Sequence, residues 1–299
     1  MSNQAALPAA THIGTAALTI ANLDRSVQFY TRVLGFHELR RNEQTAVLGT
    51  QGGNPLLALV QQSGATPQPA YTTGLYHIAT LLPSRNDLAR VLAHMAQEHY
   101  PLSGFADHLV SEALYLDDPD GNGLELYRDR PRAEWHWQDD GQVRMASDPL
   151  DVQQLLNEGL QSLTEQDWQG FPEGTMVGHM HLRVGNIQQA EQFYHGLLGF
   201  DIIAHMPQAL FVSAGGYHHH IGLNTWQSKD APRPSVDSVG LRFFTVALPN
   251  QEEVQKVCAR LQTAGVAVTE QKQGFLTRDP WGNVLFVTNG PLVSDKLIQ

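Results

Sequence analysis

The chain has 299 residues, 42% of them hydrophobic and 16% charged, so it is long enough for two domains with hydrophobic cores of their own. Its 19 basic and 30 acidic residues give a net charge of −11, and so negative a molecule repels phosphate backbones, which argues against nucleic-acid binding. A single cysteine excludes an internal disulfide framework and any cysteine-rich zinc or iron–sulfur site.

Membrane and secretory classes are also disfavoured. No apolar run approaches the ~20 residues needed to cross a bilayer. The first residues lack the basic start of a secretory signal. We therefore expect a cytoplasmic protein with no membrane partner. The 14 histidines indicate metal chemistry if several of them lie close together.

Two segments of the first part of the chain recur in the second part. FYTRVLGF (29–36) recurs 164 residues later as FYHGLLGF (193–200), and DPDGNGLELY (118–127) recurs 161 residues later as DPWGNVLFVT (279–288). Nearly equal offsets of this length indicate a duplicated domain rather than a solenoid of short repeats.

Each half of the chain reads as two modules of β-α-β-β-β order, from its apolar periodicity and turn residues. The predicted elements of the first half, 11–130, are strands over 15–20, 45–49, 56–61, 75–82, 109–116 and 123–127, and helices over 23–34 and 85–97. In the second half, 176–290, the third module begins with a strand over 178–184 and the fourth with a strand over 239–248. Such modules cannot cover both faces of a sheet alone, so we predict an α+β fold in which four modules form two half-open mixed β-barrels.

The segment 131–175 belongs to no module. It begins with polar and turn-forming residues, so it reads as a linker. One helix is predicted within it, over 149–166, with Asp148-Pro149 as its start.

Comparison of equivalent strand positions isolates three ionisable residues. These residues are His77, Glu125 and His179, and their counterparts in sister modules are Phe243, Phe286 and Thr15. A position that accepts phenylalanine in one copy lies inside the barrel, where an unpaired charge is costly. Taken singly, each histidine reads as a structural residue and Glu125 as a partner of Arg128. Together, two histidines and a carboxylate on rigid strands form the facial triad that binds non-haem Fe(II), and the same ligands suit Mn(II).

A second concentration of histidines is the run Tyr217-His218-His219-His220. An apolar strand continues directly after it, so we place the run on the last strand of the third module. Alternation then directs His218 and His220 to one face and His219 to the other. The residues alone leave open which of the pair is functional, or whether the run is a solvated tract.

The module order, the opening GHMHLRV (178–184) and the closing DPDGNGLELY resemble the vicinal oxygen chelate superfamily of glyoxalases, bleomycin-resistance proteins and extradiol dioxygenases. GLYHIATLLPSRNDLA, DHLVSEALYLDDPDGNGLELYRDRP and GGYHHHIGLNTW resemble its CatE-like group of catechol 2,3-dioxygenases. The resemblance covers 11–130 and 176–290. It implies a mononuclear Fe(II) enzyme that opens a catechol-like ring with O2, with an aromatic diol and O2 as its partners.

The resemblance also implies roles for individual residues. His77, Glu125 and His179 match the iron ligands of catechol 2,3-dioxygenases. Tyr115, ten residues before the glutamate, and His108, on the strand before that tyrosine, match groups that hold or deprotonate the substrate hydroxyls. A histidine beside the O2 site, which serves as a proton donor, is matched by His220, with His218 as the alternative on the same face.

One departure from the family pattern concerns the modules that supply the ligands. Familiar catechol 2,3-dioxygenases use modules three and four, whereas this chain carries its ligands in modules two and three. Either these modules pair within the chain or the site forms between subunits of a homo-oligomer, and we favour the first. Two rival functions remain open: a metal-dependent lyase or transferase of glyoxalase or fosfomycin-resistance type, with His220 as a fourth ligand, and a metal-free binding protein of bleomycin-resistance type.

Overall fold

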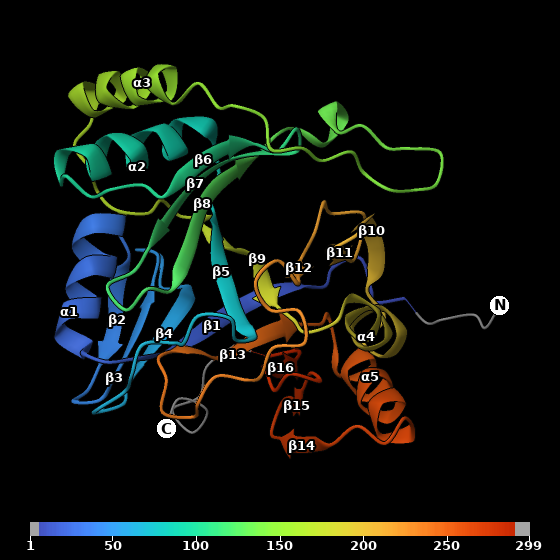
Figure 1. Cartoon of the computed structure of the whole chain (residues 1–299). Helices are drawn as coiled ribbons and strands as arrows, with labels where there is room; N and C mark the ends of the chain where they lie inside the picture. The colour runs from blue at the N-terminus through green and yellow to red at the C-terminus, as the bar shows by residue number, and fades with distance from the viewer. Residues whose placement is uncertain (1–5, 291–299) are drawn as a thin grey trace.

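The computed structural model describes residues 6–290. It contains two eight-stranded sheets of mixed strand direction (Figure 1). The first sheet contains, in spatial order, β14 (Val268–Gln271), β15 (Gly274–Arg278), β16 (Val284–Thr288), β13 (Gly240–Ala247), β1 (His12–Ile20), β4 (Pro55–Gln61), β3 (Thr45–Gly49) and β2 (His37–Arg41). The second contains β10 (Asp201–Met206), β11 (Ala209–Ser213), β12 (Ile221–Asn224), β9 (Met176–Arg183), β5 (Gly74–Leu81), β8 (Gly123–Asp129), β7 (Ser111–Asp117) and β6 (Gly104–Asp107). The predicted α+β fold of two half-open mixed barrels is confirmed.

Each sheet combines one module from each half of the chain. The first strands of modules one and four, β1 and β13, pair antiparallel at the centre of the first sheet. Those of modules two and three, β5 and β9, pair in the same way in the second sheet. The second and third modules therefore pair within one chain, as we favoured. The division into halves at 11–130 and 176–290 stays a prediction about repeat units, because neither half forms a sheet by itself.

The repeated turn sequences bind modules together in equivalent ways. Asp118 lies in the turn before β8, and its carboxylate accepts a hydrogen bond of 2.9 Å from the Tyr30 hydroxyl of module one. Asp279 lies in the turn before β16 and accepts a bond of the same length from Tyr194 of module three. Both tyrosines are fully buried. The sequence repeat is thus a repeat of buried contacts between modules.

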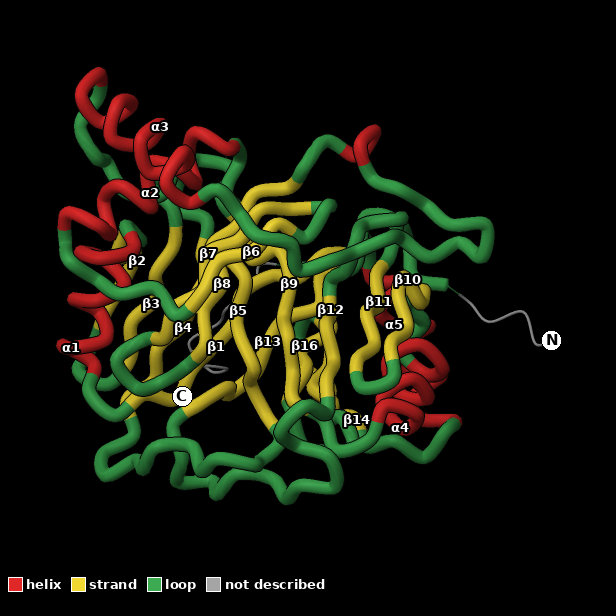
Figure 2. The backbone as a smooth tube through the Cα atoms, turned by 45° about the horizontal axis from the view of Figure 1, so that its top comes forward, coloured by secondary structure: helices red, strands yellow, loops and turns green. Residues whose placement is uncertain are grey.

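The helices lie at the two ends of the strand layer, with α1, α2 and α3 on one side and α4 and α5 on the other (Figure 2). The helical segments are α1 (Leu23–Gln28), η1 (Phe29–Leu34), α2 (Arg85–Gln97), η2 (Arg132–Glu134), α3 (Val152–Glu165), α4 (Ile187–Glu191), η3 (Gln192–Leu197) and α5 (Gln251–Thr263). Asn22 caps α1. The predicted start of the linker helix at Asp148-Pro149 is wrong: Asp151 caps α3, because the Asp148 backbone instead pairs with Asp107.

Part of the predicted linker lies against the second sheet. We call residues 130–151 the strap. The backbone of Asp148 exchanges two hydrogen bonds with Asp107 at the end of β6, and Val143 donates to the Ile203 carbonyl of β10. The strap therefore contacts both the second and the third module. None of the helices within residues 6–290 is both long and apolar enough to span a membrane.

Candidate metal centre

Three adjacent strands of the second sheet place the predicted ligands on one face. Glu125 on β8 and His179 on β9 both lie opposite Ala79 of the intervening strand β5. His77 lies two residues before Ala79, on the same face of β5. The small alanine side chain leaves space between the three larger groups.

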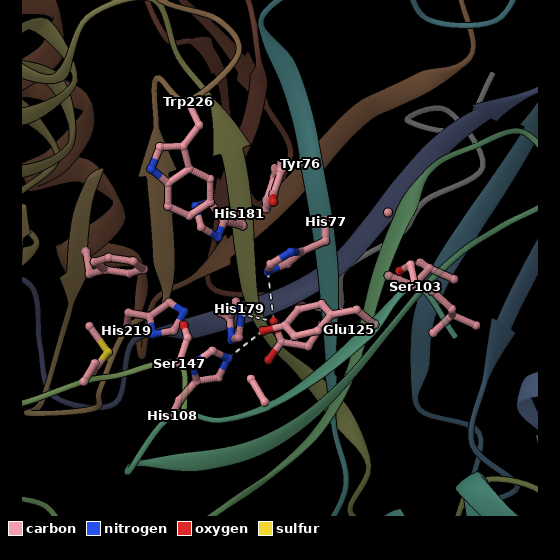
Figure 3. Close-up of a pocket in the computed structure, with 18 of the residues that line it drawn as sticks. Tyr76, His77, Ser103, His108, Glu125, Ser147, His179, His181, His219 and Trp226 are labelled. Carbon is pink, nitrogen blue, oxygen red and sulfur yellow. Dashed lines mark hydrogen bonds and ion pairs between the residues drawn. The ribbon is translucent and has the colours of Figure 1, made fainter. Parts of the chain in front are cut away.

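The ligand atoms of these residues converge (Figure 3). The Glu125 Oε2 atom lies 3.0 Å from His77 Nε2 and 3.3 Å from His179 Nε2. One ligand atom from each residue lies within 4.8 Å of the other two, and all three side chains are buried. His179 Nδ1 is buried without a hydrogen-bond partner among the described residues, so hydrogen bonding satisfies only one side of this ring.

The electrostatics of the group suit a cation. Burial opposes the charge of Glu125, but His179 and His77 hold the pKa of its carboxyl well below the usual range. Burial lowers the pKa of His179 to about 4, so its imidazole is neutral at physiological pH. A carboxylate and neutral imidazoles are the forms that bind metals, and this donor set fits Fe(II) or Mn(II).

A cavity of about 670 Å³ opens beside the three ligands. Its wall includes His77, Glu125 and His179 together with the predicted residues His108 and Tyr115. The strap contributes three residues to the wall, Met145, Ala146 and Ser147. The segment that we predicted as a linker is therefore part of the site.

The strap fixes the orientation of His108. This residue follows β6 directly and lies in the turn before β7 rather than on the predicted strand. Its Nδ1 donates to the Ala146 carbonyl at 2.6 Å, so the neutral ring accepts at Nε2 from the Tyr115 hydroxyl, also at 2.6 Å. Burial, with Glu125 close by, raises the pKa of Tyr115 well above its usual value. The tyrosine is therefore a neutral hydroxyl that can donate a hydrogen bond in the cavity.

The predicted alternation along the histidine run is wrong. Strand β12 begins only at Ile221, so residues 217–220 form an irregular turn in which alternation does not apply. His219 lines the cavity, with its ring centroid 4.0 Å from that of His179. His220 lies away from the cavity wall, and its Nδ1 accepts hydrogen bonds from Ser213 and from the Ala214 backbone.

His218 connects the cavity histidine to a carboxylate. In a neutral His218 ring whose Nε2 donates to Asp129 Oδ1 at 2.9 Å, Nδ1 is the acceptor, and it accepts from His219 Nδ1 at 2.8 Å. His219 then carries its proton on Nδ1 and keeps Nε2 free of one. Burial, with His179 and His218 nearby, lowers the pKa of His219 well below its usual value. Neither connection was visible in the sequence.

His181 is a cavity residue that our sequence analysis missed. It lies directly opposite His77 and two residues after His179 on the same face of β9, a spacing that could have identified it. Asn224 Oδ1 accepts from the Trp226 backbone, which turns its amide nitrogen toward His181 Nε2 at 3.0 Å. That nitrogen of His181 is therefore an acceptor and the ring is neutral.

The comparisons with known proteins agree with this architecture. The sequence profile of the Glyoxalase/Bleomycin resistance protein/Dioxygenase superfamily matches residues 12–126 and 176–289. The chain belongs to this superfamily. It is 44% identical over 273 residues to a catechol-2,3-dioxygenase of Bacillus subtilis, which covers 90% of this chain and 94% of the relative.

One further relative and one solved structure extend the comparison. A biphenyl-2,3-diol 1,2-dioxygenase of Rhodococcus globerulus is 33% identical over 110 residues, which cover 36% of this chain and 57% of that protein. The crystal structure of a putative dioxygenase from Bacillus subtilis superposes with a TM-score of 0.65. That alignment covers 95% of this chain and 86% of the other at 13% identity, so it supports the fold alone.

Proposed function

We propose that this superfamily member is an extradiol dioxygenase that opens the ring of an aromatic vicinal diol with O2 at a mononuclear Fe(II) site, with Mn(II) as the alternative ion. The observation that carries the proposal is the convergence of His77, Glu125 and His179 in the wall of a cavity that is also lined by His108, Tyr115 and His219. The names of the two dioxygenase relatives support the same reaction class.

His77, Glu125 and His179 would hold the metal. With only three protein donors, the ion would be able to take further ligands from the cavity. When bound there, the ion supplies the Lewis-acid and one-electron chemistry that brings a diolate and O2 together. The remaining work of the site falls on the chain's own proton donors and acceptors.

His108 and Tyr115 would receive the substrate hydroxyls. The strap holds His108 with its proton on Nδ1, so Nε2 is the basic atom that faces the Tyr115 hydroxyl. A diol hydroxyl that enters the cavity can pass its proton to His108 directly or through Tyr115. The tyrosine hydroxyl can then donate to the diol oxygen, whose negative charge needs a donor once water is displaced.

His219 would serve on the other side of the ligand strands. His219 lies in the segment that leads into β12. His108 lies just before β7 and Tyr115 lies on β7, and the three ligand strands lie between β12 and β7. His218 and Asp129 orient the His219 ring, so that Nε2 is the atom that takes up and returns a proton. We therefore assign to His219 the acid–base role that our sequence analysis gave to His220.

The two alternative functions, a metal-dependent lyase and a metal-free binding protein, require different features of the chain. The lyase-type rival rested on His220 as a fourth ligand, but His220 bonds to Ser213 and Ala214 instead. The binding-protein rival requires a protein without bound metal. The expected cytoplasmic location and the homo-oligomeric state stay predictions.

The test combines metal content with oxygen consumption. Protein purified without air should contain about one Fe(II) per chain and consume O2 with catechols, and His179→Ala should lose both properties. Stoichiometric metal without O2 uptake on any diol would contradict the dioxygenase and favour the lyase. Absence of stoichiometric metal would favour the binding protein.

A further inference from the structure

The cavity wall contains no cationic anchor for a negatively charged substituent. None of its described residues is a lysine or an arginine, and its carboxylates are Glu125 and Asp117. Two arginines close to the wall are engaged elsewhere: Arg130 pairs with Asp107 at the start of the strap, and Arg183 donates to the Leu75 carbonyl. A carboxylate on the substrate would therefore be desolvated without a partner, which is costly.

Aromatic rings form one wall of the same cavity. Trp226, Tyr76 and His181 lie side by side in this wall (Figure 3). The ring centroid of Trp226 lies 5.4 Å from that of Tyr76 and 5.6 Å from that of His181, and the centroid of Phe211 lies 5.8 Å from that of His181. His181, opposite His77, connects this wall to the metal ligands. It brings no positive charge, because Asn224 donates to its Nε2.

The aromatic wall has surface available for a ligand. Trp226 is 48% exposed and Tyr76 is 37% exposed, although both line the cavity. The apolar side chains of Met206 and Met145 also line the cavity. Such rings gain free energy by covering an apolar or aromatic group, preferably in stacked or edge-to-face contact.

The size of the cavity exceeds what an unsubstituted diol fills. Its volume of about 670 Å³ lies within the range of roughly 300–1,000 Å³ that is usual for drug-sized ligands. A single ring held at the metal ligands leaves the region beside Trp226 and Phe211 open.

We propose that the cavity selects uncharged vicinal diols that carry an apolar substituent, and that Trp226 and Phe211 contact this substituent. This inference rests on the proposed function, because it takes the diol to bind at the metal. Carboxylated catechols are disfavoured because the wall offers no cationic partner, and unsubstituted catechol binds without the gain from the aromatic wall.

Calorimetric titration of the Fe(II)-loaded protein without O2 tests this selection by binding alone. The probes are catechol, 4-butylcatechol and dihydrocaffeate, whose propanoate chain is similar in length to the butyl group but charged. We expect 4-butylcatechol to bind about 10- to 100-fold more tightly than catechol, and dihydrocaffeate to bind more weakly than catechol. Equal affinities for the butyl and propanoate compounds would overturn the proposal.

Variants of the aromatic wall test whether Trp226 is responsible for the preference among the three diols. Trp226→Ala should remove most of the advantage of 4-butylcatechol and leave the affinity for catechol within about threefold. Trp226→Arg should raise the affinity for dihydrocaffeate by about tenfold through an ion pair. Trp137→Ala is the matched control, since Trp137 is 45% exposed and lies outside the cavity wall. A loss of selectivity in Trp137→Ala, or an unchanged preference in both Trp226 variants, would contradict the assignment.

The design separates this inference from the proposed function. If diols bind and O2 is consumed but charge and substituent make no difference, the selection is wrong and the dioxygenase stands. If the selective binding appears without O2 uptake, the cavity is assigned correctly and the dioxygenase is wrong. If the loaded protein binds none of the three diols, both proposals are wrong.

Discussion

The two sheets share one plan of strands but differ on their inner faces. In the second sheet β5 and β9 place His77 opposite His181, and in the first sheet β13 and β1 place Phe243 opposite Ala17. Likewise Glu125 lies opposite Ala79 in the second sheet, whereas Phe286 lies opposite Thr245 in the first. The register is the same in both copies, so the backbone alone does not decide which sheet has a site.

The difference extends to the segment before the neighbouring strand. In the second sheet His219 packs against His179, and the cavity opens beside them. At the equivalent place in the first sheet, the Thr15 hydroxyl donates to the Pro55 carbonyl at 3.0 Å. Around it, buried side chains of Ala17, Phe243 and Phe286 pack together. The comparison teaches that one fold supports either a packed core or a polar cavity, according to a few inward positions.

The largest expected difference between the two sheets is in metal binding after a ligand residue is replaced. His179→Ala should weaken Fe(II) binding by more than about 100-fold, because it removes one of three protein donors. Thr15→Val, at the equivalent position of the first sheet, should leave the metal content unchanged. Iron analysis after gel filtration measures both, and metal loss in Thr15→Val would contradict the assignment of the site to the second sheet.

The next largest expected effect is a difference in turnover between variants of two neighbouring histidines, His219 and His220. His219→Gln should retain iron and lose turnover by about 10²–10⁴-fold, as expected for a positioned acid–base group. His220→Gln should keep turnover within about tenfold, since His220 lies away from the cavity wall. Oxygen uptake and iron content of the two variants decide the matter. A larger loss of turnover in His220→Gln would restore the role that alternation predicted.

A charge placed in the first sheet should be unfavourable. Phe286→Glu should lower the free energy of unfolding by about 3–5 kcal/mol, because the carboxylate would be buried among apolar groups without partners. Phe286→Leu is the control for lost packing, with an expected cost of about 1 kcal/mol. Urea unfolding measures both. Equal losses in the two variants would mean that packing, not charge, separates the inner faces.

The last prediction concerns acid stability. Burial lowers the pKa of His220 to about 3 in the folded protein, from 6.5 in an unperturbed histidine. Between these pH values the unfolded chain binds the extra proton, so this residue reduces stability by about 1.4 kcal/mol for each pH unit lost below 6.5.

The first sheet supplies the matched variant, because Leu56 stands at the position equivalent to His220. Metal-free His220→Leu should therefore lose stability less steeply than the parent between pH 6.5 and 4, when unfolding is followed in urea. Parallel pH dependences for the two proteins would show that His220 does not titrate in this window.

Module order and the candidate ligands were predictable from the sequence because the repeated modules can be compared with one another. Internal copies at nearly constant offset show where an apolar position has been replaced by His77, Glu125 or His179. Periodicity located most strands and the helix over 85–97, which the structure places at Arg85–Gln97. Both signals can be read without knowing which distant segments of the chain touch.

Other features depend on contacts between distant segments. Which of the three consecutive histidines reaches the cavity is decided by the irregular turn before β12, where strand alternation does not hold. The strap reads as a polar linker because its backbone hydrogen bonds with β6 and β10 leave no mark on the side-chain pattern.

The sequence by itself therefore determined the four modules, the fold class and the three residues whose side chains converge. Only the tertiary structure decided that modules two and three pair within the chain, that Asp129 and His218 orient His219, and that Trp226 and Phe211 wall the cavity. The physical reason is that burial selects residue types position by position. Hydrogen-bond partners and cavity walls, by contrast, come from segments that only the packing of the sheet brings together.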